Sequence, residues 1–198
     1  METIGRFTAA GAAVTALSYE FHNMISTISD VEMGIVQLRK VLDPATTNFE
    51  ELRSAGLRMA KDYGVAINEV LESMIVFGQQ GDKQAEVIEK TRASTLMATI
   101  TGMKAADVTE YLTSATKQYG DQIKETTGFI DAWVKVDMEH AITAEQLSKA
   151  MLRVGAVAKT AGLSFHELNG VVTAIGSVTR QTGSDIGTSL RYILRNLE

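Results

Sequence analysis

Residues 17–42 read LSYEFHNMISTISDVEMGIVQLRKVL and carry the most regular apolar pattern in the chain. Apolar side chains recur there at alternating spacings of four and three residues, as in a helix with one continuous apolar stripe. This N-terminal stripe consists of Leu17, Phe21, Met24, Ile28, Val31, Ile35, Leu38 and Leu42. The pattern predicts one long helix over residues 3–42, with the stripe buried against a neighbouring helix.

The neighbour of the stripe has two interpretations. It is either a later helix of the same chain or a second copy, which would form a coiled coil and a homo-oligomer. The positions beside the stripe include Ser18, Thr27 and Gly34, and so offer few charges with which a coiled coil selects its partner. These flanking residues weaken the coiled-coil interpretation but leave both open.

Beyond residue 42 the sequence predicts about eight shorter helices joined by glycine corners. The single proline, Pro44, lies in the break after the long helix, so no proline interrupts the helices predicted after it. The expected helices are 48–62, 66–78, 83–100, 104–118, 121–138, 144–161, 165–176 and 184–196. The chain is therefore predicted to be all-α, with a long N-terminal helix over 1–42 and a compact helical unit over 43–198.

Helix starts and ends carry their own local signals. A hydroxyl followed three residues later by Glu or Gln predicts starts at Thr47, Thr143 and Ser164, because the two side chains can cap the first backbone amides. Glycines near the ends of the apolar runs predict left-handed residues that close helices. They are Gly64, Gly78, Gly102, Gly120, Gly155, Gly162 and Gly176. Gly183 and Gly187 are expected, with Gly64 and Gly162, to be structural corners.

Two stretches of the sequence echo each other. The pattern A-K-x-x-G, followed by an acidic and apolar pair and then a glycine, occurs over 60–78 and again over 158–176, at a constant offset of 98 residues. The match indicates either one kind of helix–glycine–helix corner used twice or a duplicated half-domain. We favour the first interpretation.

Composition excludes several classes of function. Hydrophobic residues make up 45% and charged residues 22%, which is typical of a globular chain with a real core. The net charge of -5 gives no basic field for a phosphate backbone, so no nucleic-acid partner is expected. The absence of cysteine excludes disulfides and thiolate metal sites. No apolar run approaches the roughly 20 residues that a membrane-spanning helix needs.

The residues that usually carry chemistry do not form a known motif. No two of His22, His140 and His166 have the i, i+4 spacing that brings two imidazoles to one metal. Neither a nucleophile elbow nor a glycine-rich phosphate loop is present. The sequence therefore predicts no catalytic residue, no cofactor and no metal site, and the chain is not expected to be an enzyme.

The end of the chain resembles a known family. Residues 152–197, LRVGAVAKTAGLSFHELNGVVTAIGSVTRQTGSDIGTSLRYILRNL, resemble the end of the core region of tape-measure proteins of bacteriophage and prophage tails. The shared features are an A-G-[LV]-S corner, an E-[LV] helix and a G-x-x-x-G-T-x-[LF]-R run that ends in Arg191. The stretches AKDYGVAINEVLESMIVFGQQG and FIDAWVKVDMEHAITAEQLSKAM are similar to earlier parts of that region.

This resemblance implies a structural protein of the virion tail, assembled in the bacterial host cytoplasm. Its implied partners are tail-tube, tail-tip and tail-chaperone proteins, and the family has no catalytic residues in this region. Tape-measure proteins are usually several times longer, so the chain is expected to be a fragment. Because the glycine corners after residue 42 fold the chain back, we expect an anchoring or nucleating node rather than the extended ruler.

Two other classes of function stay open at this stage. The first is a helical adaptor or regulatory module that binds partner helices. The second is a helical hydrolase whose dispersed carboxylates converge in the folded chain.

Overall fold

The computed structural model describes residues 27–120, 126–139 and 142–196. The predicted class is confirmed, because every regular element in these ranges is an α-helix. The first helix covers 27–41 and is followed by α2 (Phe49–Tyr63), α3 (Ile67–Gln79), α4 (Gln84–Thr101), α5 (Ala105–Tyr119), α6 (Thr126–Glu139), α7 (Ala144–Thr160), α8 (Phe165–Thr179) and α9 (Gly183–Arg195).

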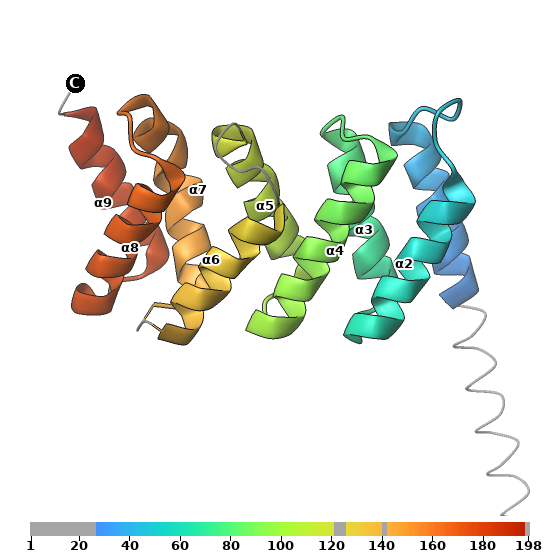
Figure 1. The fold of residues 1–198 in the computed structure, drawn as a ribbon, viewed down its shortest axis with the longest axis horizontal. Coiled ribbons are helices and arrows are strands. Elements are labelled where there is room, and N and C mark those ends of the chain that lie inside the picture. The colour runs from blue at the N-terminus through green and yellow to red at the C-terminus, as the bar shows by residue number, and fades with distance from the viewer. Residues whose placement is uncertain (1–26, 121–125, 140–141, 197–198) are drawn as a thin grey trace, which may run out of the picture.

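These helices form an elongated array of two layers (Figure 1). The first layer contains α2, α4, α6 and α8, and the second contains the helix over 27–41, α3, α5, α7 and α9. From α2 to α5 and from α6 to α9 each helix packs on its neighbour in sequence, α6 packs on α4, and α3, α5, α7 and α9 also pack on one another in that order. The helix over 27–41 lies at one end of the array and α9 at the other.

A regular period underlies the array. Successive second-layer helices from α3 to α9 begin 38 or 39 residues apart. Five hydrogen bonds between elements join residues that are 36 apart: Asn48 to Gln84, Thr99 to Tyr63, Thr109 to Ser73, Tyr119 to Gly155 and Trp133 to Asn169. The repeating unit is therefore a helical hairpin that packs on the hairpins before and after it.

The predicted helix starts are confirmed at two of three places. Thr143 accepts from the backbone N–H of Gln146, and Ser164 forms a complete capping box with Glu167. The start at Thr47 is wrong by one residue. The cap of α2 is Asn48, whose side-chain oxygen accepts from the N–H of Glu51 at 3.1 Å. An asparagine caps as well as a hydroxyl does, which the hydroxyl pattern overlooked.

The predicted left-handed corners are confirmed at Gly64, Gly102 and Gly162, with φ of 67°, 70° and 87°. After Gly64 the N–H of Val65 donates to the carbonyl of Ala60, and the equivalent bond follows Gly162. However, Gly64 leads from the first layer to the second, whereas Gly162 leads from the second to the first. The echo at 98 residues is thus one kind of corner used twice, because 98 is not a multiple of the hairpin period.

Other glycines do not end helices. Gly78, Gly155 and Gly176 lie inside α3, α7 and α8, and Gly120 has an ordinary φ of −58°. Gly78 is needed for packing, since an added Cβ would lie 2.9 Å from Val41. Helix α8 continues past Gly176 and ends at Arg180, which has a φ of 57°. The expected end of that helix at residue 176 is therefore wrong.

One continuous core runs through the array and includes the helix over 27–41. Its largest buried side chains include Trp133, Tyr119, Phe77, Leu38 and Leu52. The long helix over 3–42 falls mostly outside the described residues, so its full length and the boundary at residue 42 stay predictions.

Candidate functional site

The second half of the N-terminal stripe packs inside the same chain. Val31, Ile35, Leu38 and Leu42 are all buried, with Leu38 fully enclosed. Their helix lies against α3 so closely that a Cβ on Gly34 would come within 2.6 Å of the Leu71 side chain. On the α2 side, Arg53 forms an ion pair with Glu32 at 2.6 Å, and Arg39 lies over the ring of Phe49.

Ile28 corrects the prediction for the stripe, because its side chain is 55% exposed. The helix over 27–41 runs alongside α3 with Gly34 opposite Leu71 and Leu42 opposite Gly78. In that register Ile28 lies before the start of α3 at Ile67, so α3 does not cover it. Leu17, Phe21 and Met24 lie outside the described residues, and their burial and partner stay predictions.

Gly183 and Gly187 also differ from their predicted role as corners. Both belong to α9, which begins at Gly183 with Thr182 as its cap. They lie one turn apart on the same face, and that face packs on α7. A Cβ on Gly183 would overlap the carbonyl of Gln146, and one on Gly187 would lie 2.6 Å from the carbonyl oxygen of Ala150. These glycines allow two helix backbones to approach closely.

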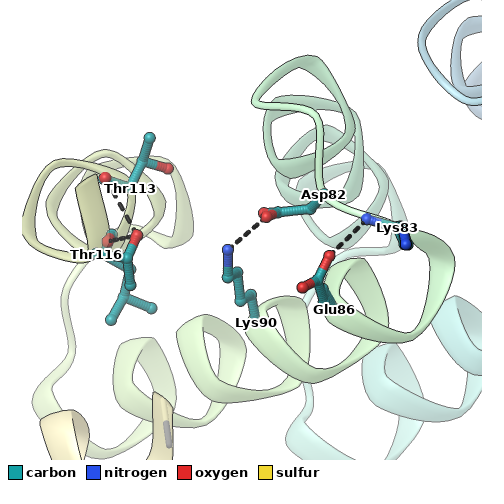
Figure 2. A network of polar contacts seen from close by, with 7 residues as sticks. Asp82, Lys83, Glu86, Lys90, Thr113 and Thr116 are labelled. Atoms are coloured by element: carbon teal, nitrogen blue, oxygen red, sulfur yellow. Dashed lines mark hydrogen bonds and ion pairs between the residues drawn. The ribbon is translucent and has the colours of Figure 1, made fainter. Parts of the chain in front are cut away.

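A polar network fastens the corner between α3 and α4 (Figure 2). Lys90 of α4 pairs with Asp82 at 2.6 Å, and Glu86 accepts from the backbone N–H of Lys83 at 2.8 Å. Across from Lys90, on α5, Thr116 donates to the carbonyl of Thr113. The small cavity between these elements has a volume of about 210 Å³. Since the bonds of Asp82 and Lys83 hold the loop to α4, we interpret the network as structural.

An aromatic cluster ties four helices together at the centre of the second half. The Tyr119 hydroxyl donates to the carbonyl of Gly155, and the Trp133 indole N–H donates to Asn169, each at 3.1 Å. The rings of Tyr119 and Trp133 both lie near that of Phe165. Burial raises the pKa of Tyr119 to about 12, so its hydroxyl stays protonated at neutral pH and acts as a donor.

The described residues contain no group of three His, Asp or Glu side chains that could hold a metal ion. His166 is exposed and its ring lies 5.6 Å from that of Phe165. Within the same ranges, no helix has both the length and the apolar character to cross a membrane.

The surface formed by the described residues has a groove between α3 and α5 and another between α6 and α8. The groove between α3 and α5, whose lining also includes Leu152 of α7, has a volume of about 480 Å³. Ser73 and Thr109 lie buried in its lining and are joined by a 2.9 Å hydrogen bond, and the exposed Glu72 and Glu110 also line it. We call it the α3–α5 groove.

The other groove lies between α6 and α8 and has a volume of about 650 Å³. Its lining mixes charges of both signs, from Lys135 and Glu139, with apolar side chains such as Val136 and Val178. A lining with charges of both signs and apolar side chains does not favour a partner of one particular charge. The α3–α5 groove, by contrast, contains two carboxylates and no cation.

Sequence reasoning missed Glu72 and Glu110. The available signal was that residues 67–79 and 105–116 contain acidic residues but neither Lys nor Arg. That signal becomes meaningful only when α3 and α5 are known to be neighbours, because the basic residues of α4 separate them in the sequence.

Comparison with known proteins adds independent findings. Residues 53–198 match the family model described as phage-related minor tail protein. A protein named as a probable tape measure protein, from Halomonas phage phiHAP-1, is 25% identical over 165 residues. That alignment covers 77% of this chain but only 19% of the relative, so the chain spans about a fifth of that protein's length. No solved structure matches the chain.

Proposed function

Since the chain belongs to the family of phage-related minor tail proteins, we propose that it is an anchoring or nucleating node of a tape-measure protein, rather than the extended part that sets tail length. Family membership makes the chain a structural component of a phage tail. In our proposal the node provides a folded surface on which tail-tube, tail-tip and tail-chaperone proteins assemble in the host cytoplasm. The measuring part would then lie elsewhere in the parent protein.

The folded-back array is the observation that carries the proposal. Residues 49–195 would extend roughly 220 Å as one continuous helix, at about 1.5 Å per residue. Instead, the chain reverses after each helix of 13 to 18 residues, and residues 36 apart form hydrogen bonds with each other. Each residue of this folded segment would therefore add many times less to tail length than a residue of an extended helix would.

The surface supports a binding role rather than catalysis. The carboxylates that line the α3–α5 groove, Glu72 and Glu110, are exposed and form no ion pair among the described residues, so they are accessible to the cations of a partner. Both grooves are open at the surface, where another polypeptide could lie. We therefore propose that this segment acts by contact alone.

Inserting residues in a surface loop distinguishes an anchoring node from a measuring segment without unfolding the array. In a phage that carries the parent gene, a flexible segment of about 20 residues is inserted between Thr46 and Thr47, in the exposed loop before α2. Tail length is then measured by electron microscopy. We expect tails of native length, because an added loop leaves the node unchanged. Tails longer by about 30 Å or more would identify a measuring segment instead.

A destabilised node provides the complementary test. Leu38→Glu places a charge in a fully buried apolar contact, so the N-terminal hairpin should lose its packing. We expect few or no tails with this variant, whereas Ile28→Glu, at an exposed position of the same helix, should assemble normally. Complete but shorter tails with Leu38→Glu would refute the nucleating role.

A further inference from the structure

The α3–α5 groove belongs to a strongly acidic part of the surface. Helix α3 carries Glu69 and Glu72 and no basic residue, and residues 105–116 of α5 carry Asp107 and Glu110 and no basic residue. All four carboxylates are outside the ion pairs formed among the described residues. The nearby Lys149 of α7 is already paired with Glu145. The groove therefore combines an apolar lining with two exposed carboxylates, Glu72 and Glu110, that form no ion pair among the described residues.

The opposite character appears on the outer face of α9. The inner face of this helix, with Gly183, Gly187 and Leu190, is buried on α7. Arg191, Tyr192 and Arg195 are exposed beyond it, and 72% of Tyr192 is accessible. At about 100° per residue these three side chains lie within one arc of roughly 100°. This α9 face offers two guanidinium groups beside an aromatic ring.

The same chain cannot bring these two surfaces together. Helix α9 packs on α7 and α8, at the end of the array, while α3 and α5 lie further along the second layer. Any contact between the groove and an α9 face therefore involves two molecules.

We propose that the α3–α5 groove binds the α9 face of a second copy of this chain. Arg191 and Arg195 of one copy lie against Glu72 and Glu110 of the next, and the Tyr192 ring enters the apolar part of the groove beside Val76 and Leu152. Charge complementarity selects this occupant, because arginine forms two-pronged hydrogen bonds with carboxylates and its neighbour tyrosine supplies apolar area. The inference does not require the proposed role in the tail.

The symmetry of the contact has a direct consequence. The groove and the α9 face are different surfaces, so each added copy leaves one groove and one α9 face free. Such a contact builds rings or open chains rather than closed two-fold dimers. Because the surfaces are small, each contact is weak, with a Kd on the order of 100 µM at low salt, and it weakens as salt screens the charges.

Charge reversal provides the test. Sedimentation equilibrium of the 198-residue chain at low salt, up to roughly 500 µM, should show concentration-dependent association. A groove variant, Glu72→Lys with Glu110→Lys, and an α9 variant, Arg191→Glu with Arg195→Glu, should each weaken association at least tenfold. Mixing the two variants should restore it, because each reversed surface then meets an opposite charge.

A matched control keeps the net charge of the groove variant. Asp62→Lys with Glu89→Lys changes two exposed carboxylates of the first layer and should associate like the unmodified chain. Circular dichroism checks that all variants melt alike. A chain that stays monomeric over this range, a mixture that fails to associate, or an association that survives both reversals would overturn the proposal. The last result would direct attention to the N-terminal stripe as the contact between copies.

Discussion

Replacing Gly187 by alanine should lower the free energy of unfolding by about 2 kcal/mol. The new Cβ would lie 2.6 Å from the carbonyl oxygen and 2.9 Å from the Cα of Ala150, both backbone atoms of α7. Ordinary contacts begin near 3.4 Å, so α9 would have to move away from α7 by several tenths of an ångström. That movement loosens the packing of Ile186 and Leu190, which are 1% and 8% exposed.

Two opposing terms determine the size of this effect. Forced overpacking of a core costs about 1–3 kcal/mol, and the upper value applies here because backbone atoms cannot rotate away. Alanine is the better helix former by about 1 kcal/mol, which offsets part of that cost. The difference leaves about 2 kcal/mol of destabilisation.

Gly170→Ala in α8 is the matched control. It makes the same chemical change inside a helix, but an added Cβ there meets nothing within 4 Å. The helix propensity then acts alone, and the free energy of unfolding should rise by about 0.5–1 kcal/mol. The two substitutions are therefore expected to have opposite signs.

Thermal denaturation followed by circular dichroism measures both variants. For a chain of this size, 1 kcal/mol corresponds to a change in Tm of about 2–4 °C. Gly187→Ala should lower Tm by roughly 4–8 °C, and Gly170→Ala should raise it by roughly 1–4 °C. Hydrogen exchange should show the loss of protection concentrated in α9. If Gly187→Ala melted at or above the unmodified chain, the close approach of α7 and α9 would be refuted.

Three further predictions test other parts of the array. Gly162→Val places a branched side chain at a φ of 87° and should destabilise the chain by about 1 kcal/mol or more; an unchanged urea midpoint would contradict the left-handed corner. Leu38→Ala should cost about 2–5 kcal/mol, whereas Ile28→Ala should cost well under 1 kcal/mol, and similar losses for both would contradict the register with α3. Hydrogen bonds from the hydroxyl and N–H of Ser164 lower the pKa of the Glu167 carboxyl, so Ser164→Ala should raise that pKa in an NMR titration. Glu167 stabilises the fold above the ordinary pKa of glutamate, and this stability is lost as pH falls through the lowered pKa. The stabilisation should be smaller in Ser164→Ala.

The sequence alone determined the local structure of this chain. Apolar spacing, caps and glycine corners placed most helix boundaries within one residue, and they predicted the left-handed φ of Gly64 and Gly162. These features depend on groups within about one helical turn of each other. An N-cap needs an acceptor and an amide three residues away, and a corner needs one residue that tolerates a positive φ. Caps and corners can therefore be predicted from a single sequence.

Tertiary structure decided what the same residue types do across the array. Gly162 and Gly187 are both glycines beside apolar positions, yet one closes a helix and the other admits the backbone of α7. Ile28 fits the apolar stripe as well as Leu38 does, but α3 begins too late to cover it. Glu72 and Glu110 share a groove only because α3 packs on α5.

The physical reason is the range of the forces involved. Backbone preference and capping act over three or four residues, whereas the partner of each packed face lies some 36 residues away, and many different small or apolar residues can form that contact. Spacing along the chain therefore encodes the helices, but only the stacking of hairpins determines which glycines separate backbones, which apolar side chains stay in water and which charges face one another.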